Sequence, residues 1–405
     1  MEKMFDVLLD PVFQQGFLES KRQKIRDAKQ FQAMKEYITG ETLARDAERL
    51  RGGDWFLKLP HLKEVAKDAT GEKRALYIFS GTDQFLLGLM GYALKHLYDH
   101  LFTDGLYSFR VNKSNYTMVE DIHHQISDRD KPPYFAFKTD MKSYSTNIDQ
   151  DILIRKLSGI FAHDPEFMAF LEWLIRRNQY MHHGQVVDKY LSALPGCPLT
   201  GFFTNVYLMD IDEYFQTHCD FYCRYTDDVL VLCREDHKVF TLLIKLRDMA
   251  RENKLELKSV KTQLFSPNEP INIVGMRFEG SELGISKESL EKIKCKGKIA
   301  AKKAVQEIRR TGISHEEAAR RFLQKTLRPF IHKADHNETN YAMRYFPFIT
   351  SDDDLREIDH WIQHCARFVL TEKWGKAQYR ASYSKLKSLG YVSLVHLYHN
   401  GCKDV

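Results

Sequence analysis

RYTDDVLVL, residues 224–232, places two adjacent aspartates between segments that otherwise favour buried strands. The segment before the aspartate pair, DFYCRY, is rich in aromatic side chains, and the segment VLVLC after the pair is branched and apolar. At the tip of a strand-turn-strand, Asp227 and Asp228 repel each other, and each carboxylate requires water or a cation. An isolated Asp-Asp pair is most often an ordinary exposed turn, so its interpretation depends on the surrounding elements.

The elements around the pair follow a recognisable order. PYFAFKTD, residues 133–140, predicts a strand that ends in an aspartate, and residues 197–215 predict a helix after Pro198. Residues 238–250 have the apolar spacing of an amphipathic helix, and residues 272–280 predict either a short strand pair or one strand with a glycine break. This alternation is typical of an α+β fold, in which helices cover one face of a sheet.

If the strand ending at Asp140 neighbours the hairpin, three carboxylates meet at one edge of the sheet. Mg²⁺ takes oxygen ligands of this kind and keeps coordination positions open for substrate phosphates. Two such ions about 4 Å apart activate a 3′-hydroxyl and stabilise a leaving pyrophosphate. The carboxylates are therefore expected to hold metal.

Several ordered segments between about residues 60 and 280 resemble reverse transcriptases. YTDD matches the Tyr-x-Asp-Asp box of that family. The other matching segments are TGEKRALYIF and GLYSFRVNKS (fingers blocks), FKTDMKSYSTNID (first catalytic block), PGCPLTGFFTNVYL (second block), LELKSVKTQLF (the lysine-bearing block) and IVGMRF (the primer-grip strand).

The resemblance implies a right-hand polymerase, with fingers and a ferredoxin-like palm carrying an antiparallel sheet, then an all-helical thumb or C-terminal region. The N-terminal helices and fingers are expected at 1–132 and the palm at 133–156 and 191–283. A fingers insertion is expected at 157–190, and the helical C-terminal region at 284–405.

The resemblance also implies roles for individual residues. Asp140, Asp227 and Asp228 would be the catalytic ligands of two Mg²⁺ ions, with Mn²⁺ as the alternative metal. Lys261 would stabilise or protonate the pyrophosphate, a role for which Lys258 competes. The implied nucleotide-binding residues are Lys73, Arg74, Met141, Tyr144, Ser145 and Asn205. The implied template- and primer-binding residues are Arg110, Lys113, Gly196, Tyr225, Gly275, Lys298, Lys302 and Lys303.

Two positions depart from the family pattern. Ser145 stands where an aromatic residue usually screens out the ribose 2′-hydroxyl, and Tyr144 lies one place earlier. Either Tyr144 provides the screen, or the enzyme accepts both sugars, or its substrates are restricted in another way. Pro195 stands where the second block usually has glutamine, so unusual handling of the template strand is expected.

The charge of the chain is unevenly distributed. The net charge is +5 over 405 residues, but residues 292–333 hold thirteen lysines and arginines against three glutamates, a local net charge of +10. Such a segment is either a solvated helix face or a phosphate-binding surface. The resemblance favours a thumb surface that holds the backbone of a nucleic-acid duplex.

Composition excludes several other classes. No stretch of 18 uncharged apolar residues is present, so no membrane span is expected, and the N-terminus lacks the pattern of a signal peptide. The seven cysteines form no CxxC pair, which is typical of reduced thiols in a cytoplasmic protein. The His pairs at 123–124 and 182–183 have no further ligand at zinc spacing.

The C-terminal segments NYAMRYFPFITSDDDLREIDHWIQHCARFVL and YRASYSKLKSLGYVSLVHLYHNG resemble bacterial defence-associated and abortive-infection reverse transcriptases. That implies antiviral DNA synthesis from dNTPs, templated by a non-coding RNA, primed by a protein hydroxyl, or untemplated. A homo-oligomer or a partner protein is compatible with the sequence. The alternatives are a retron-type enzyme that copies its own structured RNA, and an inactive RNA-binding scaffold on the same fold.

Overall fold

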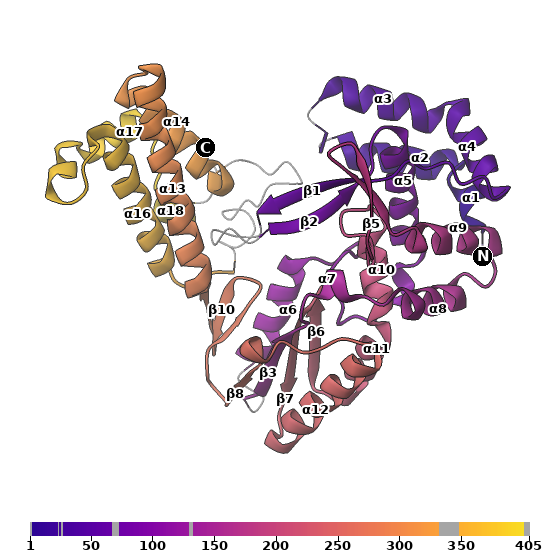
Figure 1. The fold of residues 1–405 in the computed structure, drawn as a ribbon. Coiled ribbons are helices and arrows are strands. Elements are labelled where there is room, and N and C mark those ends of the chain that lie inside the picture. Colours follow the sequence, from indigo (N-terminus) through magenta and orange to yellow (C-terminus); the bar gives the residue numbers. More distant parts are fainter. Residues whose placement is uncertain are drawn as a thin grey trace. The chain divides into compact units, whose positions relative to one another are not determined.

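The computed structural model of the chain describes residues 2–22, 24–25, 27–66, 73–128, 133–331 and 348–400. The chain divides into two compact units (Figure 1). Unit 1 comprises Met1–Met118 and Asp130–Pro267, and unit 2 comprises Val119–Arg129 and Asn268–Val405.

The first half of unit 1 is largely helical. The charge and apolar spacing of its sequence produce amphipathic helices that bury one face, such as the face of α4 that carries Leu43, Ala47 and Leu50. The apolar segment at 83–103 forms most of α5 and the short 3₁₀ turn that follows it. The elements are α1 (Met4–Val7), α2 (Pro11–Arg22), α3 (Ala28–Thr39), α4 (Glu41–Arg51), α5 (Thr82–Leu97) and η1 (Asp99–Leu101).

A four-stranded sheet in unit 1 has the order β2-β1-β4-β5. β1 (His61–Ala66) and β2 (Lys73–Ile78) form an antiparallel pair, as do β4 (Gln179–His182) and β5 (Gln185–Asp188). β1 and β4 pair in parallel, so a hairpin from the expected insertion joins strands that lie more than 100 residues earlier.

The second sheet of unit 1 has the order β6-β7-β3-β8 and is antiparallel throughout. Its strands are β3 (Phe135–Asp140), β6 (Phe221–Tyr225), β7 (Asp228–Cys233) and β8 (Gln263–Phe265). β7 is buried from Val229 to Cys233, as the continuous apolar run VLVLC predicts for a strand covered on both faces.

Helices cover this second sheet. α12 packs on β3 and β7, and α11 packs on β6 (Figure 1). The predicted helix at 197–215 is confirmed as two consecutive helices, and the amphipathic helix at 238–250 is confirmed as α12. The remaining helices of unit 1 are α7 (Tyr144–Asn147), α8 (Gln150–Ile160), α9 (Pro165–Arg176), α10 (Thr200–Tyr207), α11 (Met209–His218), α12 (Asp236–Glu252) and η2 (Ser259–Lys261). The residues of α6 (Asn115–Ser127) are divided between unit 1 and unit 2.

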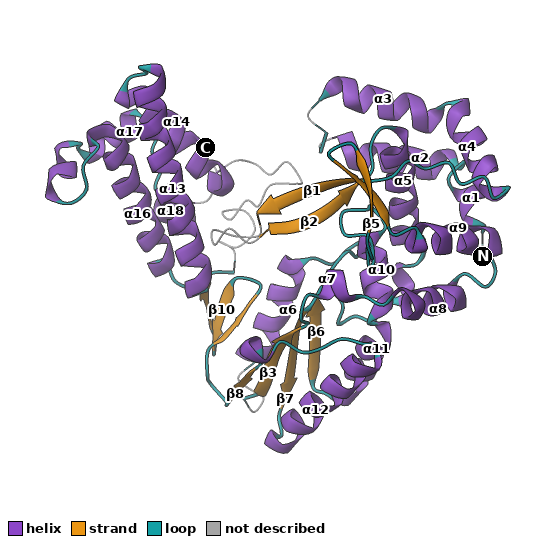
Figure 2. Cartoon of the chain, in the orientation of Figure 1, coloured by secondary structure: helices purple, strands orange, loops and turns teal. Residues whose placement is uncertain are grey.

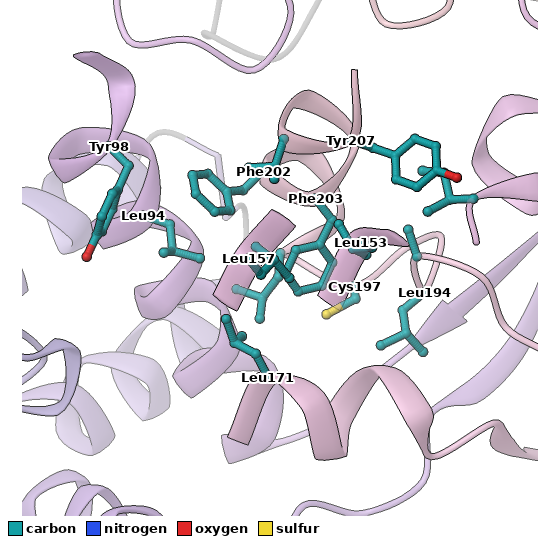
Figure 3. Packing of buried hydrophobic residues seen from close by; sticks show 14 of the residues in the cluster. Leu94, Tyr98, Leu153, Leu157, Leu171, Leu194, Cys197, Phe202, Phe203 and Tyr207 are labelled. Carbon is teal, nitrogen blue, oxygen red and sulfur yellow. The ribbon is translucent and has the colours of Figure 1, made fainter. Parts of the chain in front are cut away.

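The hydrophobic core of unit 1 joins helices that are distant in sequence (Figure 3). Leu94 of α5, Leu157 of α8, Leu171 of α9 and Phe203 of α10 are each fully buried in it. Complete burial of such a side chain stabilises the fold by about 1.5–3 kcal/mol. The core therefore fixes the segments that resemble reverse transcriptase motifs relative to one another within this unit.

Unit 2 combines a small antiparallel sheet with long helices (Figure 2). The predicted strand pair at 272–280 is confirmed as β9 and β10, which a third strand extends. α16 packs on both α13 and α14. The elements are β9 (Ile271–Ile273), β10 (Met276–Glu279), β11 (Glu282–Ile285), α13 (Lys287–Thr311), α14 (His315–Ile331), α16 (Asp353–Thr371), η3 (Lys376–Arg380), α17 (Tyr383–Ser388) and α18 (Leu394–Asn400).

Unit 2 includes the β9–β11 sheet together with the C-terminal helices. Leu283 exchanges hydrogen bonds with Thr350, and the amide of Ile285 donates to the carboxylate of Asp354. These bonds attach the β9–β11 sheet to the C-terminal helices. Residues 340–347, part of the C-terminal segment that resembles defence-associated enzymes, lie outside the described residues.

The predicted α+β class is confirmed by these two units. Across the described parts of the chain, none of the helices combines the length and apolarity that crossing a bilayer requires.

Candidate active site

The strand register brings acidic residues together at one edge of the second sheet. Asp140 at the end of β3 and Asp228 at the start of β7 are direct Cα partners, and Asp227 precedes Asp228 in the turn. Directly opposed residues in an antiparallel pair have Cβ atoms about 4.5–5.5 Å apart. The sheet therefore holds two carboxylates side by side and a third next to them.

Burial and charge act together on Asp228. Its burial raises the pKa of the carboxyl group, and the neighbouring carboxylates of Asp227 and Asp140 raise it further. The ammonium groups of Lys138 and Lys261 oppose this shift. An acid with a raised pKa ionises more readily when a cation is close, because the cation stabilises the charged form.

Lys261 already supplies one positive charge at this edge. Its ammonium donates to Oδ2 of Asp140. Burial alone would lower the pKa of Lys261, but this hydrogen bond and the three surrounding carboxylates raise it. Lys261 is therefore charged and interacts with Asp140, Asp227 and Asp228 together, whereas Lys258 meets this site through its backbone N–H, which donates to the carbonyl of Asp140.

Asp140 has an unsatisfied atom. The residue is 3% exposed, and its Oδ1 is buried with no hydrogen-bond partner among the residues that the structure describes. Leaving a carboxylate oxygen buried and unpaired is costly, so such atoms in folded proteins need an explanation. A cation bound between the carboxylates would satisfy Oδ1, which is how the residues fit Mg²⁺.

The carboxylates are not preassembled as a complete metal cage. Over the described ranges, no group of three or more His, Cys, Asp or Glu side chains is arranged to hold a metal ion. Mg²⁺ is usually bound by one or two carboxylates together with substrate phosphates and water, so the arrangement of Asp140, Asp227 and Asp228 fits a site completed by substrate.

The two basic residues of β2 differ in their surroundings. The ammonium of Lys73 lies 2.7 Å from Oε2 of Glu64 on β1, and this exposed pair raises the pKa of Lys73. Arg74 is exposed, and the described residues offer it no acidic partner within ion-pair distance. Of the two cations, Arg74 is the one whose charge is available to a ligand.

Of the three candidate nucleotide-binding residues that closely follow Asp140, two are buried. Met141 is 1% exposed and forms a β-bridge with Leu257. Tyr144 is 4% exposed, its hydroxyl donates to the carbonyl of Thr204, and burial raises its pKa strongly. Ser145, the position of the usual aromatic screen, is only half-buried.

Asn205 of α10 is also enclosed. It is 1% exposed, its amide nitrogen donates to the carbonyl of Ser108 at 2.8 Å, and its amide oxygen accepts from the Ser108 hydroxyl at 3.2 Å. Both ends of the amide are thus engaged within the protein.

The loop around Gly196 is bonded to strand β2. Gly196 has φ +100°, and a Cβ atom there would lie 3.0 Å from the backbone nitrogen of Tyr77. That same amide donates to the carbonyl of Pro195 at 2.7 Å. Leu194 also has a positive φ, of 54°, which is rare for a residue with a Cβ atom.

The cations expected to meet nucleic acid in unit 1 are paired. Arg110 is buried and makes a bidentate ion pair with Asp99, at 2.7 and 3.1 Å. Lys113 lies 3.5 Å from a carboxylate oxygen of Asp104 and 4.6 Å from the ring centroid of Tyr107. Tyr225 is half-buried on β6.

The remaining expected residues belong to unit 2. Gly275 lies between β9 and β10 with φ +87°. Lys298, Lys302 and Lys303 are exposed on α13, and within the part of the chain that the structure describes none of them makes an ion pair.

The sequence reasoning missed the residues that support the hairpin turn, namely Ser108, Asp212 and Arg224. Arg224 is fully buried in β6, where its guanidinium binds the carboxylate of Asp212. An arginine within an aromatic strand next to the Asp-Asp pair was the available signal, because a buried guanidinium requires an acidic partner.

A profile of the family described as "Reverse transcriptase (RNA-dependent DNA polymerase)" matches residues 66–278, more than half of the chain. This range contains β2, both halves of the second sheet and all three aspartates. No curated protein matches the sequence.

Among solved structures, the chain is similar to apo telomerase from Candida tropicalis, with 12% identity, a TM-score of 0.47 and coverage of 84% of this chain and 62% of that one. A C-terminally truncated form of that enzyme gives 14% identity, a TM-score of 0.43 and coverage of 56% and 55%. Telomerase from Candida albicans in complex with a fragment of telomeric RNA gives 11%, 0.44, 88% and 65%. The chain thus spans less than two thirds of each of these telomerase chains.

Proposed function

Because the chain belongs to the reverse transcriptase (RNA-dependent DNA polymerase) family, we propose that it adds deoxynucleotides to a 3′-hydroxyl at Asp140, Asp227 and Asp228. The observation that carries this proposal is the direct pairing of Asp140 with Asp228 across β3 and β7, with Asp227 adjacent. The fingers would then be the N-terminal region with the β4–β5 hairpin, the palm the sheet β6-β7-β3-β8, and the thumb the helices of unit 2.

The three carboxylates would hold two divalent metal ions, Mg²⁺ or Mn²⁺. When bound, such ions lower the pKa of the attacking hydroxyl and neutralise the charge that develops on the phosphates. The buried, unpartnered Oδ1 of Asp140 supports this assignment, because a metal ion would satisfy it. A binding scaffold without catalytic activity gains nothing from burying an unpaired carboxylate oxygen, which disfavours the scaffold alternative.

Two cations would act on the phosphates of the incoming dNTP. Lys261 carries a raised pKa beside the carboxylates, and we assign it the stabilisation or protonation of the leaving pyrophosphate. Arg74 on β2 would bind the triphosphate by charge-assisted hydrogen bonds, since its guanidinium is exposed.

The exposed lysines of α13 would hold the backbone of the template–primer duplex. Lys298, Lys302 and Lys303 present charge to solvent without ion-pair partners among the described residues, and phosphate binding by such lysines is independent of sequence. The partners would be an RNA template and the DNA product.

For the biological role we propose antiviral defence in the cytoplasm, with a non-coding RNA as template or with untemplated or protein-primed synthesis. The C-terminal sequence segments that resemble defence-associated enzymes support this role. A retron-type enzyme that copies its own structured RNA remains the closest alternative, and sequencing of co-purified nucleic acid separates the two.

The proposal is tested with the purified full chain, Mg²⁺ and radiolabelled dNTPs, supplied singly or together, with and without an RNA template annealed to a DNA primer. Template-dependent extension by the wild-type chain, abolished in Asp227→Ala at an unchanged melting temperature, is the expected result. Incorporation of a single dNTP without template would indicate untemplated synthesis. Absence of incorporation by the wild-type chain under all conditions, with Mg²⁺ or Mn²⁺, would contradict the proposal.

A further inference from the structure

Thr226, between Tyr225 and the aspartate pair, is held at each of its polar groups. It adopts a left-handed conformation with φ +58°. Its backbone N–H donates to Oγ of Ser108 at 3.0 Å, and its carbonyl accepts from Nη1 of Arg224 at 2.8 Å. Its hydroxyl donates to Oδ1 of Asp227 at 2.8 Å. A turn residue with this many specific bonds is fixed in position and not merely tolerated.

The left-handed conformation makes these bonds necessary. A β-branched residue with positive φ is an uncommon backbone state that persists only where the surroundings over-determine it. Glycine or asparagine would adopt the same turn at lower cost, but neither carries a hydroxyl on a β-carbon that can bind the next side chain. Threonine at this position therefore adopts a less favourable backbone conformation than glycine would, but it gains a direct hydrogen bond to Asp227.

The first support reaches Thr226 through a serine and an asparagine. Ser108 and Asn205 are each 1% exposed. The hydroxyl of Ser108 donates to the amide oxygen of Asn205, which orients its lone pairs toward the N–H of Thr226. Asn205 also donates to the carbonyl of Ser108 at 2.8 Å, so its amide fixes both the backbone and the side chain of that serine.

The backbone next to Ser108 is tied to the same strand. The amide of Arg224 donates to the carbonyl of Gly105 at 2.8 Å, and the amide of Tyr107 donates to the carbonyl of Arg224 at 2.9 Å. A Cβ atom at Gly105 would lie 2.5 Å from the ring of Tyr222, so only glycine allows this close approach. Ser108 is thus delivered to the turn by a segment bonded alongside β6.

The second support is a buried ion pair. Arg224 donates from Nε and Nη2 to the two carboxylate oxygens of Asp212, at 2.6 and 2.5 Å, and Tyr222 donates to Oδ1 at 2.7 Å. Arg224 and Asp212 are 0% and 1% exposed. With two of its nitrogens locked by Asp212, the guanidinium has its third nitrogen aimed at the carbonyl of Thr226.

We propose that Ser108 and Arg224, backed by Asn205 and Asp212, are positioning residues that lock the Thr226 turn and thereby aim the carboxylate of Asp227 at the metal-binding edge. The inference rests on the proposed function for the purpose of the aim, but the lock itself is a property of the turn. It assigns Asn205 an indirect role through Ser108, in place of the direct nucleotide contact that the sequence resemblance implies.

The least disruptive test removes the hydroxyl oxygen of Ser108. Ser108→Ala deletes the acceptor for Thr226 N–H while leaving the apolar core intact. Loss of a residue that orients a metal ligand typically costs about 10-fold to 100-fold in metal affinity or activity. We expect Mn²⁺ binding to the full chain, followed by electron paramagnetic resonance titration, to weaken by about that factor. In primer extension, kcat should fall comparably while KM for the dNTP changes by less than about 3-fold, since the substrate contacts are untouched.

Two controls accompany this variant. Ser20→Ala likewise removes one serine hydroxyl, which here donates to the backbone carbonyl of Phe17 on α2. It should bind Mn²⁺ and extend primers as the wild type does. Ser108→Thr restores a hydroxyl at the same place and should recover most of the lost metal affinity.

A second pair of variants tests the other end of the lock at Thr226, which is half-buried. Thr226→Val removes the hydroxyl that binds Asp227 but keeps the branched shape, whereas Thr226→Ser keeps the hydroxyl. Valine should reproduce the defect of Ser108→Ala, and serine should not. This pair decides the matter if Ser108→Ala lowers the melting temperature by more than a few degrees.

The outcomes separate this inference from the proposed function. Unchanged Mn²⁺ affinity and kcat in both Ser108→Ala and Thr226→Val would overturn the positioning role, even with an active wild-type enzyme. If the wild-type chain extends no primer but these variants bind Mn²⁺ more weakly than it does, the positioning role is supported and the polymerase proposal fails.

Discussion

The ammonium of Lys261 binds one carboxylate oxygen of Asp140, while the other oxygen of that carboxylate is buried without a partner in the described part of the chain. One side of Asp140 is thus neutralised by the protein and the other is left for a ligand. This division connects the strand register to the chemistry, because Asp140 lies opposite Asp228 and both are near the charge of Lys261.

Replacement of Lys261 by glutamine should lower kcat for nucleotide addition by about 10²-fold, the lower range for loss of a general acid. KM for the dNTP should change less, because the lysine acts on the leaving group and not on the base or sugar. Single-turnover primer extension measures the effect. Lys258→Gln is the matched control, and an equal loss in that variant would assign the role to Lys258.

The raised pKa of Asp228 predicts a specific pH dependence of stability in metal-free protein. Because the folded carboxyl holds its proton more tightly than the unfolded one, the stabilisation is fully present below the ordinary value of 3.8. It is lost as the pH rises through the raised folded value. Thermal unfolding of wild type and Asp228→Asn across this range should show the extra downward slope only in the wild type.

Added Mg²⁺ should reverse that trend above the raised pKa, since binding to the folded state alone increases apparent stability. Equal pH slopes in the wild type and in Asp228→Asn would contradict the assignment of the shift to this carboxyl group.

The two basic residues of β2 should respond differently to truncation. Arg74→Ala is expected to raise KM for the dNTP by about 10-fold or more, since a charge-assisted bond to phosphate is among the stronger hydrogen bonds. Lys73→Ala should have a smaller effect, because that ammonium is paired with Glu64. Steady-state extension at varied dNTP concentration checks this order, and a larger effect at Lys73 would refute it.

Sugar selection should depend on Ser145 and not on Tyr144. Ser145→Tyr is expected to increase discrimination against ribonucleotides, measured as the ratio of kcat/KM for dNTP and rNTP. Tyr144→Phe should leave that ratio unchanged and lower the free energy of unfolding by about 1 kcal/mol, since it removes the buried bond to Thr204. A changed ratio in Tyr144→Phe would show that the buried ring reaches the sugar.

The exposed lysines of α13 should set the salt dependence of nucleic-acid binding. Each of Lys298→Gln, Lys302→Gln and Lys303→Gln should reduce the slope of log K against log salt by about 0.9 for duplex DNA if that lysine contacts a phosphate. Lys294 is the control on the same helix, because its ammonium is paired with Glu291 and Glu357. Fluorescence anisotropy at several salt concentrations measures the slopes, and equal slopes in all four variants would exclude α13 as the contact surface.

The elements with strong local patterns were predictable from sequence. The continuous apolar run of β7 and the apolar spacing of α12 specify their own structure, and the order of motifs suggested that Asp140 and Asp228 would meet. Such features depend on short-range periodicity and on a few recognisable spacings.

Features created by distant partners were not predictable. The burial of Arg110 follows from its pairing with Asp99, and the burial of Asn205 from its bonds with Ser108, 97 residues away. Neither pairing produces a spacing pattern that can be recognised in the sequence. The hydrogen bond between Leu283 of β11 and Thr350 likewise joins residues 67 positions apart, which no local pattern encodes.

The hydrogen bond between the amide of Tyr77 and the carbonyl of Pro195 has a mechanical consequence. It joins the strand that carries Arg74 to the loop that carries Gly196. The two backbones approach so closely that a Cβ atom at Gly196 would lie 3.0 Å from the backbone nitrogen of Tyr77. With the roles that the family resemblance implies for Arg74 and Gly196, we expect binding of the triphosphate and placement of the templating base to be coupled, so that a mismatched base weakens nucleotide binding before any bond is made.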